Sequence, residues 1–127
     1  MPFVRITLRE GQSQKTISAI AESVHNALVE VFKIPEADRF QVVHEVKANQ
    51  HIYPPNYLDV PHTEDILFIH ITAKEGRTVE MKKNLYAKIA SQISQITRIS
   101  PDDVFIVLSE NKEEDWSFGR GRAQLVE

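Results

Sequence analysis

The sequence contains no cysteine among its 127 residues. This absence excludes a disulfide framework, a thiolate zinc site and a catalytic thiol. The chain also lacks an apolar run of about eighteen residues, so we expect no membrane-spanning segment. Lysine and arginine number 15 against 18 aspartate and glutamate, a net charge of −3. That balance argues against nucleic-acid binding, which needs a dense basic surface.

The start of the chain lacks the pattern of a secretory signal, because no basic segment followed by an apolar core is present. We therefore expect a cytoplasmic protein with a single domain spanning residues 1–127. The five histidines show no metal-ligand spacing, and neither a metal nor another cofactor is predicted. Any catalysis would have to use other groups.

The chain contains an internal repeat. The segment FVRITLREG (3–11) resembles FIHITAKEG (68–76), and at the same offset KIPEADRFQVV (33–43) aligns with RISPDDVFIVL (98–108). Such self-similarity indicates two fused copies of one structural unit.

We place the copies at about 2–46 and 67–111, joined by a loop (47–65) and followed by a tail (112–127). In the first copy, apolar residues alternate over 3–8 as in a strand. They then recur at steps of three and four, which predicts an amphipathic helix of about five turns.

The remaining elements follow the same scheme. Pro35 ends the first helix, and residues 40–46 form a second predicted strand. In the second copy we predict strands at 66–72 and 104–108, with a helix between them. Two βαβ units predict an α/β (α+β) fold, a four-stranded sheet with two helices on one face. The other face would be bare, which favours oligomerisation.

Pro2 is the first candidate for chemistry. Methionine before a small residue is usually removed, and proline at the new terminus would carry a secondary amine. An α-amino group titrates near about 8, and desolvation lowers that value towards neutrality. Such an amine can act as a general base or acid. The alternative is that Pro2 merely begins a strand, a position that proline tolerates.

Arg77 follows Gly76 where the second predicted helix starts, whereas the first copy has Gln12 there. A cation at that end opposes the helix dipole, and a carboxylate ligand would explain its placement. A solvated loop arginine is the equally open alternative. In a pseudo-twofold arrangement, the start of one copy's first strand lies beside the end of the other's. The amine of Pro2 and the guanidinium of Arg77 are then expected to share one pocket.

Three further residues are weaker candidates. Asp38 has Asp103 as its repeat counterpart, which favours a structural turn, with activation of water as the alternative. Trp116 and Phe118 in the tail are candidates to line a pocket, although buried aromatic residues more often belong to a core.

These features resemble the tautomerase superfamily, whose members use an amino-terminal proline. The resemblance rests on Pro2, the repeated βαβ unit and the stretch Glu75-Gly76-Arg77-Thr78…Lys82. The stretches PEADRFQVVHE (35–45) and SPDDVFIVLSENKEEDWSFGRGRAQL (100–125) are similar to the malonate semialdehyde decarboxylase branch.

The resemblance implies that Pro2 is catalytic, that Asp38 matches a functional aspartate, and that Trp116 and Phe118 match pocket residues. That branch has two arginines before its second helix. Arg77 matches the second of them, whereas the first falls on Glu75 or Lys74, which changes half of the carboxylate clamp. The resemblance also implies a homotrimer of fused subunits.

The leading hypothesis is an isomerase that moves a proton between the enol and keto forms of a small 2-oxo or 2-hydroxy acid. Neutral Pro2 would be the general base and Arg77 would hold the substrate carboxylate, with Lys74 as a second contact. One alternative is a decarboxylase or hydratase with protonated Pro2 and with Asp38 steering water. Another is a non-catalytic oligomer that binds carboxylates. Both enzymatic hypotheses require removal of Met1, since otherwise the proline nitrogen is an amide.

Overall fold

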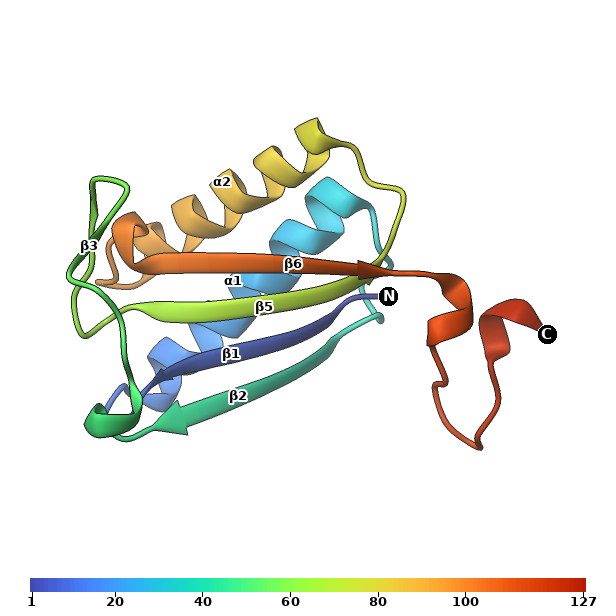
Figure 1. Ribbon diagram of the computed structural model, residues 1–127, viewed down its shortest axis with the longest axis horizontal. Coiled ribbons are helices and arrows are strands. Elements are labelled where there is room, and N and C mark those ends of the chain that lie inside the picture. Colours follow the sequence, from blue (N-terminus) through green and yellow to red (C-terminus); the bar gives the residue numbers. More distant parts are fainter.

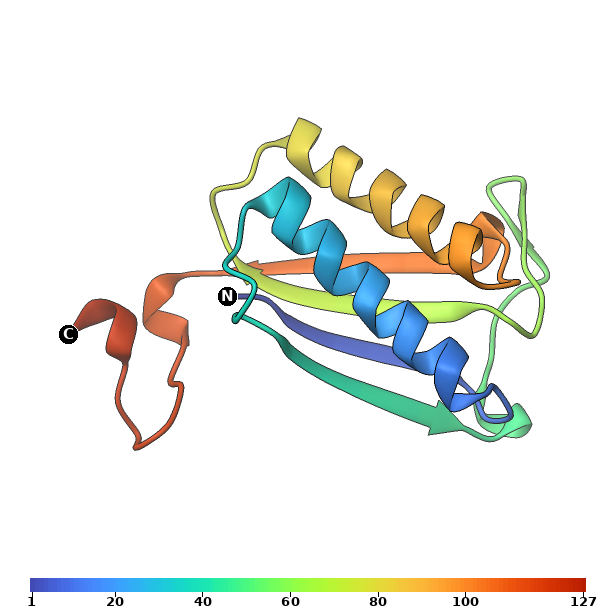
Figure 2. The same ribbon diagram turned by 180° about the vertical axis from the view of Figure 1, so that it is seen from behind.

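The computed structural model describes residues 1–127. Its main sheet has four strands in the order β2-β1-β5-β6: β1 (Phe3–Arg9), β2 (Phe40–Val46), β5 (Leu67–Lys74) and β6 (Val104–Asn111). The pairs β1/β2 and β5/β6 are parallel, while β1 and β5 are antiparallel. Helices α1 (Gln14–Phe32) and α2 (Val79–Ile96) lie side by side over one face (Figure 2). The predicted pair of βαβ units is confirmed.

Both helices begin at equivalent positions of the repeat. The hydroxyl of Ser13 accepts a hydrogen bond from the Thr16 backbone N–H, and Thr78 does the same for Met81. Such caps satisfy backbone donors that the first helical turn leaves free. Gly76 has φ 123° and lies in the turn just before this cap. This backbone conformation favours glycine, so the glycine at position 76 allows the chain to turn after β5.

The core lies between the helices and the sheet. A cluster of eighteen buried apolar residues joins alternate strand residues to the inner faces of both helices. Ile6, Ile71, Leu85 and Ile89 are each at most 1% exposed. Alternation along the strands sends the other residues of the sheet to the opposite face. Neither helix is both long and apolar enough to cross a membrane.

Two strands differ in extent from the sequence prediction. We predicted 66–72 and 104–108, whereas β5 and β6 run on to Lys74 and Asn111. Polar residues such as Ser109 occupy the extra length, and hydrophobic alternation does not detect them. Backbone pairing between β5 and β6 nevertheless continues as far as Lys74 opposite Asn111.

The segments outside the repeats lie at opposite ends of the sheet. The connecting loop forms a short 3₁₀ helix (Ala48–Gln50) and a small hairpin, β3 (Asn56–Tyr57) and β4 (Val60–Pro61). Two further 3₁₀ turns lie in the tail, at 113–115 and 124–126, and one at 101–103 directly precedes β6 within the second copy. The tail projects beyond the end of β6, at the end of the sheet where the chain starts (Figure 1).

Candidate active site

Strand register brings the chain start to two functional candidates. In the parallel pair Phe3 lies opposite Phe40, which places residue 1 beside Asp38. In the antiparallel pair Phe3 lies opposite Thr72, which places residue 1 beside Lys74. Because β1 is an inner strand, it meets residues of both copies at this edge of the sheet. The pairing of the strands thus brings the chain start, Asp38 and Lys74 together.

The terminal amine in this structure belongs to Met1, and Pro2 behind it is buried. The amine nitrogen lies 3.7 Å from Asp38 Oδ2. Burial lowers the pKa of this amine from its ordinary value of 8.0, and Arg77 and Lys74 add to that lowering. Asp38 acts in the opposite direction, because its negative charge favours the protonated amine.

Arg77 lies between β5 and α2 and is half-buried. Its Nη1 donates a hydrogen bond of 2.9 Å to the Lys74 carbonyl, and its guanidinium lies 4.8 Å from the ring centre of Phe32. Phe32 ends α1 and is buried. The aromatic face and the carbonyl fix the guanidinium but leave its charge without a carboxylate partner.

Lys74 is already paired with an acid from the tail. Its Nζ lies 3.1 Å from Glu113 Oε1. Both residues line a cavity of about 390 Å³ between the end of β5 and the tail, together with Glu75 and Lys112. Arg77 differs from Lys74 in having no carboxylate within ion-pair distance, so its charge remains available to an incoming anion.

The tail aromatic residues stack on each other. The rings of Trp116 and Phe118 have centroids 5.8 Å apart with an interplanar angle of 22°. The Trp116 indole donates a 2.7 Å hydrogen bond to Asn111 Oδ1, and Phe118 is 41% exposed. Both residues lie in the projecting tail, and they are not among the residues that contact the terminal amine.

The two aspartates that the repeat makes equivalent have different environments. Asp38 is half-exposed and faces the amine. Asp103 is 2% exposed and accepts hydrogen bonds from the backbone N–H and hydroxyl of Thr63. The structural role that the sequence suggested for both therefore applies to Asp103, whereas Asp38 belongs to the candidate site.

Sequence reasoning missed two residues of this cluster. Phe32 lies under the Arg77 guanidinium, and Glu113 pairs with Lys74. Phe32 follows the apolar stripe of its helix, so nothing in the sequence distinguishes it from a core residue. Glu113 lies in an acidic run of the tail, and its partner could be found only from the path of the chain.

The fold and this cluster define a class of protein: a fused pair of βαβ units with a buried chain start, a carboxylate and an arginine at one edge. Two sequence profiles, each described as "Tautomerase enzyme", match residues 38–119 and residues 2–59. The chain belongs to the tautomerase family, and the resemblance noted in the sequence is confirmed.

Individual relatives extend over the whole chain. It is 43% identical over 127 residues to a probable tautomerase of Bacillus subtilis (strain 168), YusQ, with all of both chains covered. A second probable tautomerase of that organism, YrdN, is 33% identical, with 99% of this chain and 97% of the relative covered.

A solved structure is similar to the same extent. It is the FG41 malonate semialdehyde decarboxylase inhibited by 3-bromopropiolate, which is 38% identical to this chain. The superposition has a TM-score of 0.91 and covers 98% of this chain and 94% of that one. The similarities therefore include both tautomerases and a decarboxylase.

Proposed function

We propose that the protein is a tautomerase that interconverts the enol and keto forms of a small 2-oxo or 2-hydroxy acid. The observation that carries the proposal is the meeting of the chain start, Asp38 and Arg77 at one edge of the sheet. Removal of Met1 would leave Pro2 with a free secondary amine in this environment. The burial and the two cations that lower the pKa of the Met1 amine would likewise favour the neutral form of Pro2, which is a base.

In the proposed reaction the neutral Pro2 nitrogen accepts the proton of the enol hydroxyl. The enolate that forms is a planar anion, and Arg77 holds its carboxylate while stabilising the added charge. The ammonium of Pro2 then returns the proton to carbon and gives the ketone. One proton moves from oxygen to carbon, and the amine ends in its starting state.

The proposed ligand set follows from the charges at this edge. Arg77 takes the substrate carboxylate because it has no acidic partner, whereas Lys74 shares its charge with Glu113. Lys74 can become a second substrate contact only when its ion pair with Glu113 breaks. Trp116 and Phe118 would cover the substrate from the tail and exclude water.

The proposed assembly is a homotrimer. On the sheet face away from the helices, Phe40, Val42, Phe105 and Val107 are 38–51% exposed, and this is a large apolar surface for a single chain to leave open. Structures described as symmetric trimers of fused 4-OT share the fold, with a TM-score of 0.78 in one case. Packing of three such faces would bury these residues.

A decarboxylase or hydratase is the second candidate, and a specific contact favours it. Asp38 lies 3.7 Å from the Met1 nitrogen, and beside a Pro2 terminus its negative charge would favour the protonated amine that polarises a carbonyl group. The similar solved structure is named a malonate semialdehyde decarboxylase. The two candidates differ in the protonation state in which the amine acts.

The test uses protein whose Pro2 terminus has been verified by intact mass. We expect turnover of phenylenolpyruvate or 2-hydroxymuconate, with kcat/KM rising with pH as the amine loses its proton. Pro2→Ala should lower kcat by about 10²–10⁴-fold, the range typical of general acid–base catalysis. Asp102→Asn, a charge removal at the far end of the sheet, is the matched control and should keep full activity.

Two results would count against this assignment. Unchanged turnover by Pro2→Ala would show that the secondary amine of proline is not required, since alanine at that position offers only a primary amine. Activity on a β-keto acid that falls as pH rises, without enol turnover, would replace the tautomerase by the decarboxylase.

A further inference from the structure

The repeat maps the candidate site onto the opposite end of the sheet. Shifting each residue by the repeat offset takes the positions of Met1, Asp38, Lys74 and Arg77 to Ile66, Asp103, Arg9 and Gln12. The strands also pair in the equivalent way at this end. Leu67 of β5 lies opposite Val104 of β6, and Thr7 of β1 lies opposite Phe68 of β5. The opposite end of the sheet therefore has the same backbone arrangement as the candidate site, but no chain terminus lies there.

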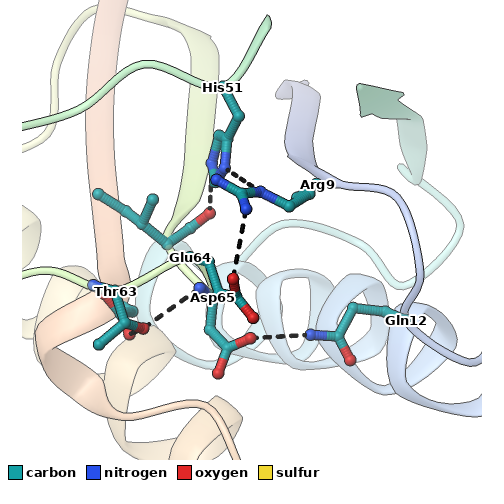
Figure 3. Close-up of polar contacts among 8 residues, drawn as sticks. Arg9, Gln12, His51, Thr63, Glu64 and Asp65 are labelled. Atoms are coloured by element: carbon teal, nitrogen blue, oxygen red, sulfur yellow. Dashed lines mark hydrogen bonds and ion pairs between the residues drawn. The ribbon is translucent and has the colours of Figure 1, made fainter. Parts of the chain in front are cut away.

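The connecting loop occupies this opposite end of the sheet (Figure 3). Arg9 Nη1 donates to Glu64 Oε2 over 3.3 Å, and Gln12 Nε2 donates to Asp65 Oδ1 over 3.3 Å. Glu64 and Asp65 lie shortly before β5, which begins at Leu67, and point towards the end of β1. The loop thus presents carboxylates to the counterparts of Lys74 and Arg77, the residues assigned to the substrate carboxylate.

Two buried groups hold the loop in this position. Asp103 accepts a 2.8 Å hydrogen bond from the Thr63 backbone N–H and one of 2.5 Å from its hydroxyl. His51 is 4% exposed; its Nε2 lies 3.1 Å from the Ile66 carbonyl, and its Nδ1 accepts from Arg9 Nε. Arg9 is therefore held by two residues of the loop.

The geometry points to a second carboxylate-binding site in each chain, one that the chain fills with its own Glu64 and Asp65. A cavity of about 210 Å³ remains there, lined by Glu64 and Asp65 and by the end of β1 and the residues after it, Leu8, Arg9, Glu10, Gly11 and Gln12. The loop acts as an internal plug: it occupies the second site, whereas Arg77 of the first site stays open to substrate. This inference rests on the proposed function for the class of ligand, a carboxylate.

The plug predicts that each chain binds one carboxylate ligand, although it contains two similar sites. Arg77 has a carbonyl and an aromatic face as partners and remains open to an external carboxylate. Gln12, its counterpart, already shares its amide with Asp65. A free carboxylate must displace a tethered one at the second site, and the tether gives the internal group a high effective concentration.

The first experiment uses the wild-type protein and pyruvate as the probe. A titration followed by NMR on the arginine side-chain Nε–H signals should shift the signal of Arg77 and leave that of Arg9 in place. A shift of Arg9 with the same midpoint as Arg77 would overturn the plug. A static Arg77 signal would instead count against the proposed function, because the plug makes no demand on Arg77.

The second experiment opens the plug with the double variant Glu64→Gln and Asp65→Asn. The signal of Arg9 should now shift with pyruvate, at a midpoint roughly tenfold or more below any seen in the wild type. Asp59→Asn removes a charge from the same loop, away from these contacts, and should behave as the wild type. Repeating the titration in an Arg77→Gln background makes the result independent of the first site.

A folded double variant whose Arg9 signal still ignores pyruvate would refute the second site. Circular dichroism verifies the fold. If the double variant does not fold, Asp65→Asn alone carries the test, and the Gln12 side-chain amide signal is then the readout. In that single variant a pyruvate-dependent shift of the Gln12 amide supports the plug, and an unmoved signal contradicts it.

Discussion

Replacing Asp38 by asparagine should make the terminal amine lose its proton more readily. The carboxylate lies 3.7 Å from the Met1 nitrogen and raises the pKa of that amine against the effect of burial. Two unit charges at this distance attract by about 1 kcal/mol in a water-like dielectric. We use this lower limit because the Asp38 side chain is 30% exposed. Such an energy corresponds to about a fivefold loss of proton affinity.

The assay is competitive acetylation of the terminal amine across a pH series, in protein that keeps Met1 and read by mass spectrometry of the terminal peptide. In Asp38→Asn the midpoint of labelling should move to lower pH, since the neutral amine is the reactive form. Asp102→Asn, in the exposed turn at the other end of the sheet, should leave the midpoint in place.

An unchanged midpoint in a folded Asp38→Asn variant, or a midpoint at higher pH, would refute the electrostatic reasoning. The same sign should appear in the protein that starts at Pro2. There the rising limb of kcat/KM should move to lower pH, because the lost carboxylate favoured the protonated amine.

Three further predictions follow from other contacts. Arg77→Gln should raise KM for a carboxylate substrate roughly 10–100-fold through loss of a charge-assisted hydrogen bond; an equal loss for the substrate's methyl ester would contradict a carboxylate contact. Asp103→Ala should lower the free energy of unfolding in urea by about 1–3 kcal/mol, because it removes the two hydrogen bonds that the buried Asp103 carboxylate accepts from Thr63. A decrease in the free energy of unfolding of less than about half a kcal/mol would contradict a structural role for Asp103. Phe105→Glu, on the bare sheet face, should convert the proposed trimer to monomers in light scattering, and a variant that stays trimeric would place the interface elsewhere.

The sequence predicts much of this fold because the hydrophobic periods are strong and occur twice. Alternation over 3–8 and the helical spacing from Ile17 onwards specify the first strand and helix without reference to the rest of the chain. The repeat then supports the second unit even where its helix is less apolar. The placement of the chain start and Arg77 at one edge of the sheet also follows from pseudo-twofold symmetry, before any side chain is placed.

The sequence does not distinguish Asp38 from Asp103, which occupy equivalent positions. Their difference comes from what approaches each one: a chain terminus at Asp38, and Thr63 of the connecting loop at Asp103. The contact between Lys74 and Glu113 is hidden for a similar reason. Such contacts depend on the path of non-repeated segments, and no periodicity constrains that path.

The inner position of β1 has a consequence for how the protein would lose activity on heating. Chain ends usually fray well before the rest of a domain unfolds. Here the first strand is hydrogen-bonded on both sides, to β2 and to β5, from Phe3 onwards. The strand that carries the amine therefore cannot come loose without disruption of the centre of the sheet. Thermal inactivation and cooperative melting should coincide, with no lower-temperature step at which a folded protein has lost only its site.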